Sequence, residues 1–291
     1  MAGRKLEIRD NLEKTYADVF SPEAVAALEA LAGFDADRKA LMAVRIERRA
    51  ARARNQQRID FLDPQAIIAR TRIMVQDARA GAFTGSEIPW DLQRQWVQGT
   101  GPAAKPNAPV ETSIRNVAYA LLSGADGWMF DGEDALGQVS TMSLDNQRNL
   151  KLAIHRDPVF LKVAEGVAGE MNAWARGFFG REIIADWRQQ LDFTTKLFRA
   201  RGLHLDDRHV RHAGGESFSA SIVDLVLYAA NNHRRLRQSG ASVVLYLPKI
   251  QTAEEAALWN DLLTALEINL TCPPARSRST CSSSRSKRAS N

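Results

Sequence analysis

The chain has 291 residues, of which 45% are hydrophobic and 25% are charged, a composition typical of a soluble globular protein. Its length allows one large domain or two smaller ones. No apolar run approaches the length of a membrane-spanning helix, and the N-terminus is too charged for a secretory signal. We therefore expect a cytoplasmic protein that does not contact membranes.

The net charge of +5 is unevenly distributed. Residues 272–291 contain five basic side chains and no acidic one, so the rest of the chain carries as many acids as bases. Both cysteines, Cys272 and Cys281, lie in the same tail. Residues 1–271 therefore have no disulfide and no Cys nucleophile, and their balanced charge argues against a nucleic-acid partner.

The sequence pattern predicts helix throughout residues 1 to about 70, with Ser21 as an N-cap and Pro22 as the first helical residue of one segment. Residues 38–58 carry eight basic side chains against one acid, Glu47. Such a helix could grip phosphates, but no aromatic stacking residues interleave with the arginines. We favour a solvated face whose long side chains pair with acids elsewhere.

From about residue 95, short apolar segments alternate with helical ones. Strands are expected at 96–98, 127–130, 203–205 and 242–249, and helices at 114–122, 144–155, 159–177, 220–238 and 252–266. This alternation indicates βα units and a parallel sheet. Ionisable residues follow three of the strands: Asp131, Glu133 and Asp134, then Arg201, then Lys249. A barrel and an open sheet both place chemistry at such strand ends, and periodicity does not separate them.

The acidic cluster from Asp131 to Asp134 could coordinate Mg²⁺ or hold a base near a substrate, but a solvated turn with a helix cap explains it equally well. Arg201 has small neighbours that leave its guanidinium fork open to clamp a carboxylate, although a lone Arg is more often a surface residue. The five histidines form no zinc-binding motif and are expected to be ordinary packed or exposed residues. Phosphate-loop, nucleophile-elbow and dinucleotide motifs are absent from the sequence.

Several segments together resemble malate synthase, most closely its A-type form. Residues 199–210, Arg-Ala-Arg-Gly-Leu-His-Leu-Asp-Asp-Arg-His-Val, are similar to the family's Arg-Pro-Arg-Gly-Trp-His-Leu motif. Residues 219–224, Ser-Ala-Ser-Ile-Val-Asp, resemble the start of its Ser-Gly-Ser-Leu-x-Asp helix. Residues 245–250, Leu-Tyr-Leu-Pro-Lys-Ile, resemble its Tyr-Leu-Pro-Lys-Met strand. The resemblance covers about residues 95–267.

This resemblance implies an α/β fold, a (β/α)8 TIM barrel of malate synthase type that is incomplete in this chain. We expect an N-terminal helical clasp-like region over 1–94, the first half of the barrel over 95–267 and an aberrant basic, serine-rich tail over 268–291. The implied activity is a transferase reaction that condenses glyoxylate with acetyl-CoA to give malate and CoA, as in the glyoxylate cycle. Arg201 matches the family's catalytic Arg, and Glu133, Asp134 and Lys249 are expected to bind substrate.

The resemblance also implies a Mg²⁺ cofactor, which would polarise the glyoxylate carbonyl. The family's metal ligands and its catalytic Asp have no counterpart here, so we expect them in a missing C-terminal part and expect this chain to be inactive and poorly folded. A reading-frame shift near codon 270 would explain the tail, because a one-base offset can encode a strand ending in Glu. A natural disordered basic tail is the alternative.

The chain departs from the family pattern at Gly132, Leu203 and Ala135, where the family has Phe, Trp and Ser. A related carbon–carbon lyase or ligase that acts on a CoA thioester with another aldehyde acceptor therefore stays open. A non-enzymatic module that holds RNA through the arginine-rich helix and the tail is a second alternative, but it leaves the strand-end motifs unexplained. The sequence does not set the oligomeric state.

Overall fold

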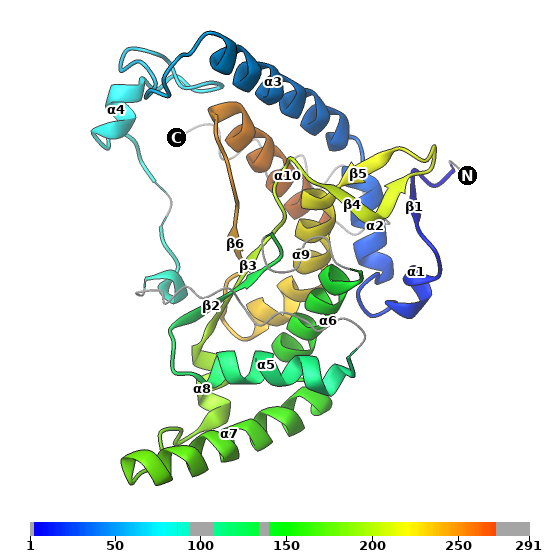
Figure 1. Cartoon of the computed structure of the whole chain (residues 1–291), viewed down its shortest axis with the longest axis vertical. Coiled ribbons are helices and arrows are strands. Elements are labelled where there is room, and N and C mark those ends of the chain that lie inside the picture. Colours follow the sequence, from blue (N-terminus) through cyan, green and yellow to red (C-terminus); the bar gives the residue numbers. More distant parts are fainter. Residues whose placement is uncertain (1–2, 86, 94–107, 134–139, 272–291) are drawn as a thin grey trace. The chain divides into compact units, whose positions relative to one another are not determined.

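The computed structural model describes residues 3–85, 87–93, 108–133 and 140–271 (Figure 1). The chain divides into two compact units, one formed by residues 1–6, 26–87 and 250–291 and the other by residues 7–25 and 88–249. None of the described helices is long and apolar enough to cross a membrane.

Three parallel strands lie at the centre of the larger unit: β2 (Gly127–Asp131), β3 (Thr195–Arg199) and β6 (Val244–Tyr246). The sheet order is β2-β3-β6, so strands that follow one another in this sheet are also neighbours in space, as in a βα barrel. Over the described residues the three strands form an open sheet rather than a closed barrel. The predicted incomplete barrel is confirmed in this form.

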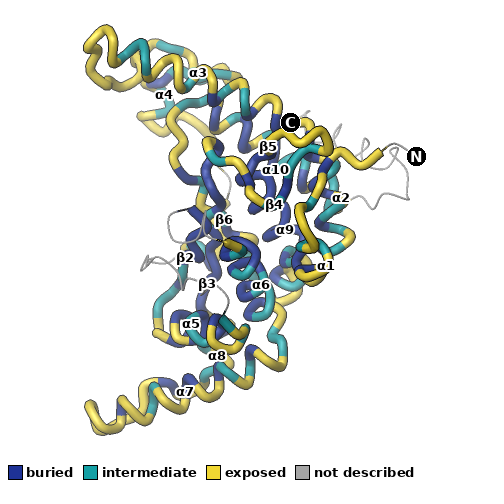
Figure 2. Tube along the Cα trace, turned by 45° about the vertical axis from the view of Figure 1, so that its right-hand side comes forward, coloured by how far each residue is buried: buried dark blue, intermediate teal, exposed yellow. Residues whose placement is uncertain are grey.

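Helices cover one face of this sheet. The elements of the unit are α1 (Leu12–Thr15), the 3-10 helix η1 (Trp90–Leu92), α5 (Val110–Leu122), α6 (Met142–His155), α7 (Pro158–Phe179), α8 (Trp187–Phe193) and α9 (Ala220–Gln238). Figure 2 shows α9 mostly buried, whereas the far end of α7 is exposed. A second sheet, ordered β1-β4-β5, contains β1 (Leu6–Ile8), β4 (Asp206–His212) and β5 (Ser217–Ser219).

The two faces of the parallel sheet are packed differently. Phe198 stacks on Tyr228 of α9, with ring centroids 5.0 Å apart, on the helical face. Met129, Leu197 and Val244 form a small cluster of buried residues against Leu92. Because strand side chains alternate between faces, Leu197 and Phe198 point in opposite directions, and Lys196 points to the same face as Phe198.

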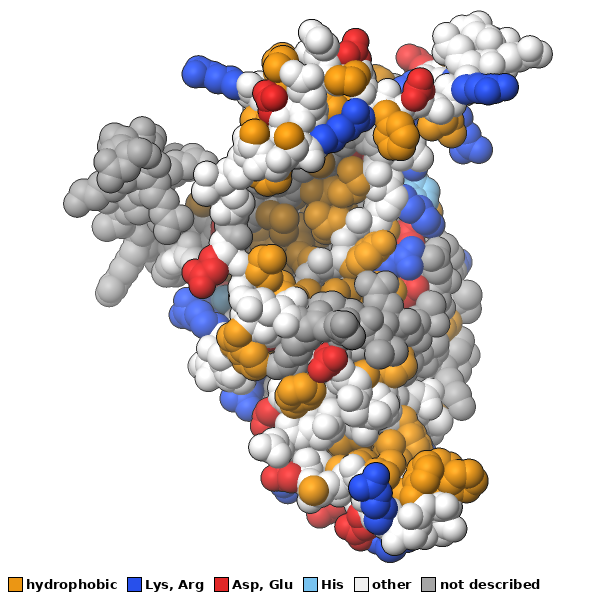
Figure 3. Space-filling model, turned by 90° about the vertical axis from the view of Figure 1, so that its left-hand side faces the viewer, with side chains coloured by type: hydrophobic (Ala, Val, Ile, Leu, Met, Phe, Trp, Pro, Cys, Tyr) orange, Lys and Arg blue, Asp and Glu red, His pale blue; other side chains and the backbone are white. Residues whose placement is uncertain are grey.

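The smaller unit is helical and includes most of α2 (Pro22–Leu31), all of α3 (Phe34–Arg54) and α4 (Val75–Arg79), and α10 (Ala253–Thr271). Arg45 of α3 lies 3.4 Å from Glu255 of α10. Arg38 and Lys39 both pair with the buried carboxylate of Asp35. Basic and acidic side chains are interspersed on the surface drawn in Figure 3. The Arg45–Glu255 pair matches our interpretation of a basic face that pairs with acids elsewhere, whereas Arg38 is buried rather than solvated.

Several predicted boundaries are confirmed. The helix α2 begins at Pro22, and the Ser21 hydroxyl accepts a hydrogen bond from the Ala24 amide. The helix predicted at 220–238 has those bounds in α9. Thr252 caps α10 by accepting a hydrogen bond from the Glu255 amide.

Other expectations are wrong. Residues 1–70 are not helical throughout, because a strand precedes α1 and the helix α3 ends at Arg54. Residues 203–205 contain a turn rather than a strand; the strand is β3, which ends four residues earlier. The strand expected at 242–249 is limited to Val244–Tyr246. The strand expected at 96–98 lies outside the described residues.

Candidate functional site

Charged side chains gather at the carboxyl ends of the three parallel strands. Asp131 ends β2, Arg199 ends β3, and Lys249 follows β6 by three residues. Because the strands are parallel, these ends share one edge of the sheet. Asp134, which we predicted to bind substrate together with Glu133 and Lys249, lies outside the described residues.

Glu133 joins the loops that follow the three strands. Its carboxylate is almost fully buried and lies 2.7 Å from the Lys249 ammonium nitrogen. The other carboxylate oxygen accepts a hydrogen bond from the Gly202 amide, and the His204 imidazole lies 3.7 Å from Glu133. The structure therefore brings two of the predicted substrate-binding residues into direct contact. It also adds His204, which we expected to be an ordinary packed or exposed residue.

Two glycines allow these loops to approach each other. A Cβ at Gly132 would lie 2.8 Å from the Arg199 carbonyl oxygen and 3.3 Å from an Asp224 carboxylate oxygen. A Cβ at Gly202 would lie 2.7 Å from the His204 ring and 3.3 Å from Glu133. Contacts below 3.0 Å do not leave room for a side chain, so the arrangement requires glycine at both positions.

Arg201 is at the centre of a buried ion-pair network and is only 1% exposed. Asp224 accepts three hydrogen bonds from it, two of them from the guanidinium, at 2.7 to 2.9 Å. Asp207 lies 2.7 Å from the same guanidinium. The expected open fork is therefore a wrong prediction, since two carboxylates of the chain already engage it.

The electrostatics of this network keep Arg201 charged. Burial alone lowers the pKa of Arg201, but Asp224 and Asp207 outweigh burial and hold that pKa above its ordinary value. Asp207 is fixed in turn by the amides of His209 and Val210, each 2.7 Å away. A buried charge that is paired and hydrogen-bonded in this way is rigidly placed.

The sequence analysis missed both acids as partners of Arg201. Asp224 lies just over one turn into α9, whose N-cap Ser219 accepts a hydrogen bond from the Ile222 amide. It belongs to the Ser-Ala-Ser-Ile-Val-Asp segment that resembles the family, so a signal was present. The contact across 23 residues of sequence depends on how α9 packs behind the strand ends, which no local pattern encodes.

Two further features complete the edge. Asp131 accepts a hydrogen bond from the Glu133 amide at 2.8 Å and lies 3.3 Å from the Arg199 guanidinium. Lys249 has a backbone φ of 55°, a left-handed conformation that non-glycine residues rarely adopt. Such backbone strain often occurs at functional sites, and the binding role of Lys249 stays a prediction.

The described residues do not fit a Mg²⁺ site. Four carboxylates lie at this edge, and each already contacts a cation: Asp131, Glu133, Asp207 and Asp224. In the described part of the chain, no group of three or more His, Cys, Asp or Glu side chains is arranged to hold a metal ion. The edge is thus a network of ion pairs rather than an open cluster of oxygen ligands.

Comparisons with known proteins agree with this geometry. Residues 195–282 match the model of the malate synthase TIM barrel domain. The chain is 28% identical to malate synthase of Myxococcus xanthus over 93% of its own length and 43% of that protein. It is 28% identical to malate synthase of Streptomyces clavuligerus over 85% of this chain and 39% of that protein. The corresponding values for Escherichia coli malate synthase A are 27%, 88% and 40%.

The chain spans about two fifths of the length of these relatives. Within that span, the matched domain includes β3, Arg201, Asp224 and Lys249. Through this domain and through relatives that align with most of its length, the chain is similar to malate synthases.

Proposed function

We propose that the strand-end edge of this chain forms part of a malate synthase-type site, which condenses glyoxylate with acetyl-CoA to give malate and CoA. A cytoplasmic location and a place in the glyoxylate cycle are parts of the same proposal. The observation that carries it is the convergence of Arg201, Glu133 and Lys249 from three different loops on one sheet edge. Catalytic groups of βα barrels lie at this edge.

Each residue would have a distinct role. Arg201, which Asp224 and Asp207 hold in place, stays the predicted catalytic residue and would stabilise the negative charge that develops on the enolate and alkoxide oxygens. Lys249 is the most exposed of the three and would attract the glyoxylate carboxylate. Glu133 would hold the Lys249 amine in position through the 2.7 Å ion pair. Asp134 stays a predicted substrate-binding residue at the acetyl-CoA end.

The Mg²⁺ cofactor that the family implies enters no step of this proposal, because the described residues do not fit it. The same contacts bear on turnover. Removing a proton from the acetyl methyl group needs a carboxylate that can accept it, and the four carboxylates that the structure describes at this edge are all engaged by cations. We therefore propose that the 291-residue chain binds the substrates but does not turn them over by itself.

Calorimetric titration of the full chain with glyoxylate and with acetyl-CoA tests the binding role. We expect Lys249→Met to weaken glyoxylate binding about tenfold, the value of one charged hydrogen bond. The matched control is Lys162→Met, which removes an exposed lysine on α7 and should leave binding unchanged. Absence of binding by the unaltered chain, or equal binding by both variants, would reject the proposed site.

Thiol release from acetyl-CoA in the presence of glyoxylate tests the second part of the proposal. We expect no glyoxylate-dependent release by the 291-residue chain. Measurable release would disprove the predicted inactivity while supporting the assignment of the reaction.

A different aldehyde acceptor is the second candidate, and two positions favour it. Leu203 is buried where the family has Trp, and Gly132 leaves no room for the family's Phe beside the Arg199 carbonyl. A smaller side chain at each position would change the shape of an acceptor site at this edge. Titration with a larger 2-oxo aldehyde distinguishes the candidates, because tighter binding of it than of glyoxylate would favour the second.

A further inference from the structure

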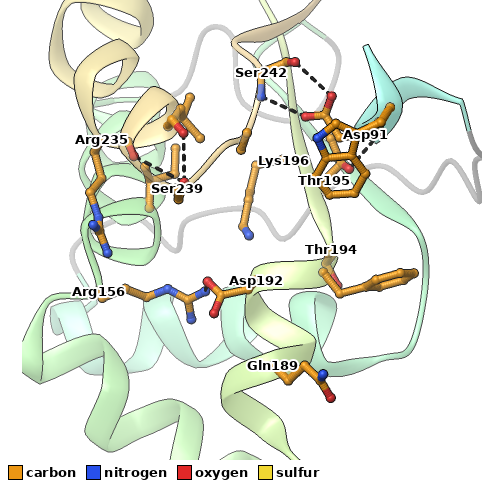
Figure 4. A pocket seen from close by; sticks show the side chains of 15 residues that line it. Asp91, Arg156, Gln189, Asp192, Thr194, Thr195, Lys196, Arg235, Ser239 and Ser242 are labelled. Carbon is orange, nitrogen blue, oxygen red and sulfur yellow. Dashed lines mark hydrogen bonds and ion pairs between the residues drawn. The ribbon is translucent and has the colours of Figure 1, made fainter.

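A second group of charged residues lies at the opposite end of the parallel sheet. A cavity of about 280 Å³ opens beside the N-terminal end of β3, between α8 and the end of α9 (Figure 4). Three basic side chains line it: Lys196 from β3, Arg156 from the end of α6, and Arg235 from α9. This cavity shares no lining residue with the Glu133–Lys249 edge.

Lys196 is buried, with 9% of its surface exposed, and its side chain points away from the strand into the cavity (Figure 4). Its amine donates a hydrogen bond to the Leu191 carbonyl. In the described part of the chain, no carboxylate lies within ion-pair distance of this amine. Burial, assisted by the positive charge of Arg156, lowers the pKa of Lys196 to about 7.

Arg156 is held in the cavity by an unusual backbone. It is the C-cap of α6 with φ of 58°, a position where glycine is the favoured residue. Its guanidinium pairs with Asp192 of α8, an acid that is 69% exposed. Burial lowers the pKa of Arg156, while Asp192 raises it and Arg235 lowers it. Because Asp192 is largely exposed to water, its attraction for the arginine is weakened by solvent.

Arg235 adds a third positive charge to the same wall. Over the described residues, the structure gives its guanidinium no ion-pair partner, and the hydrogen bonds at this residue use its backbone carbonyl. The remaining acid of the lining, Asp91, is already occupied, since its two oxygens accept hydrogen bonds from the Ser242 amide and hydroxyl at 2.8 Å each. Figure 4 shows the Asp91 carboxylate directed at Ser242.

The charges of this cavity do not balance. Three basic side chains face it against two acids, Asp192 and Asp91, and Asp192 is the lining acid that pairs with one of the cations. Positive groups brought together in a partly buried space repel each other, and an anion bound among them relieves that repulsion. Guanidinium and ammonium groups are also the donors that bind carboxylate and phosphate oxygens.

We propose that this cavity is a binding site for a small oxyanion, a carboxylate or a phosphate, held by Lys196, Arg156 and Arg235. The volume is near the lower end for ligand pockets and selects a compact ligand. The apolar part of the lining, which includes Ile154 and Leu236, would shield the ion pairs from water. The proposal does not depend on the malate synthase-type reaction at the opposite edge.

Calorimetric titration of the full chain with inorganic phosphate and with acetate, against chloride at equal ionic strength, tests the site and separates the two ligand classes. We expect binding of at least one of the two ions, and the ion that binds more tightly identifies the class. Arg235→Gln should weaken binding about tenfold. The matched control, Arg237→Gln, alters an exposed arginine on the same helix that does not line the cavity, and it should leave binding unchanged.

The pH dependence of acetate binding tests Lys196 itself, since acetate keeps its charge above pH 6. Arg156, Asp192, Arg235 and Asp91 are the charged groups facing this amine. None of them has an ordinary pKa near neutrality. A bound anion favours the protonated amine, so acetate affinity should fall about tenfold between pH 7.5 and 8.5, and Lys196→Met should abolish this slope. No binding of either ion, equal loss in both arginine variants, or a slope that persists in Lys196→Met would overturn the proposal.

Discussion

The two ends of the parallel sheet carry similar numbers of charged side chains, but their charges are arranged in opposite ways. At the carboxyl edge, the described residues include four acids and three cations, and each of these carboxylates contacts a positive group. At the amino edge, three cations line one cavity and a single acid pairs with one of them. At the carboxyl edge, side chains of the chain itself compensate the charges. At the amino edge, the excess positive charge is relieved either by a lowered pKa of Lys196 or by a bound anion.

This difference follows from how the chain enters each edge. The residues that follow the strands bring distant acids to this edge, as helix α9 does when it places Asp224 beside Arg201. At the amino edge, Lys196 is fixed as the second residue of β3, and the elements around it end in arginines. The carboxyl edge therefore gains rigidity from pairing, and the amino edge keeps unbalanced charge that a ligand can use.

The largest predicted effect comes from breaking the satisfied edge. Asp224→Asn removes the main partner of Arg201 and leaves a buried guanidinium with Asp207 alone. Removing one partner of a buried ion pair costs about 3–5 kcal/mol, and because Asp207 still compensates part of the guanidinium charge we expect a loss near the lower end of that range. Urea unfolding of the full chain should show the loss as a lower transition midpoint.

Asp192→Asn is the matched control at the amino edge. It also removes the acid of an arginine pair, but Asp192 is largely exposed, so we expect a loss within about 1 kcal/mol. If the two variants lose similar amounts of stability, the contrast between a satisfied and an unsatisfied edge is wrong.

The next effect is a pH dependence that comes from the amino edge. Lys196 has a pKa of about 7 in the folded chain against an ordinary 10.5, so between these values unfolding takes up a proton. The free energy of unfolding should therefore rise with pH, by about 2 kcal/mol from pH 7 to pH 9. Lys196→Met should lack this rise, and subtracting its unfolding curve from that of the original chain removes the contribution of other groups. A difference that stays constant over this range would show that Lys196 is charged and compensated.

A smaller effect is expected where the loops of the carboxyl edge come closest. Gly132→Ala places a Cβ 2.8 Å from the Arg199 carbonyl oxygen, a backbone atom that cannot move aside cheaply. We expect a loss of roughly 1–2 kcal/mol from this overpacking. Gly166→Ala within α7 meets open space and should instead stabilise the chain by about 0.5–1 kcal/mol, because alanine favours helix. Thermal unfolding that shows the same sign for both variants would contradict the close approach at Gly132.

The carboxyl edge was the more predictable of the two because its residues follow recognisable strands and motifs. Glu133, Arg201 and Lys249 could be placed at strand ends before their contacts were known. Their partners could not, because Asp224 reaches Arg201 through the packing of α9 and Asp207 reaches it through a turn that we expected to be a strand. Asp134 stays a prediction.

The amino edge left almost no trace in the sequence. The strand β3 has the sequence Thr-Lys-Leu-Phe-Arg and is buried over most of its length. Its two charged residues do not suggest a buried strand, so the sequence pattern did not predict it. Strand prediction relies on alternation or on an apolar run, and this segment has neither. Because β3 was not predicted, the burial of Lys196 was not predicted either. Nothing in the sequence distinguished Arg156 and Arg235 from ordinary arginines at helix ends.

The smallest predicted effect tests whether burial or the number of hydrogen bonds determines how much an arginine pair stabilises the chain. Arg115 binds Glu170 through two nitrogens, and Tyr119 joins the same carboxylate at 3.0 Å, so this surface cluster on α5 and α7 has contacts comparable to those between Arg201 and Asp224. Its members are exposed to water, where the hydration given up offsets the attraction and salt screens the rest. Glu170→Gln should therefore shift the urea midpoint much less than Asp224→Asn, and raising the salt concentration should reduce even that shift. A loss as large as that of Asp224→Asn would mean that hydrogen-bond geometry, rather than burial, determines how strongly an arginine pair stabilises this chain.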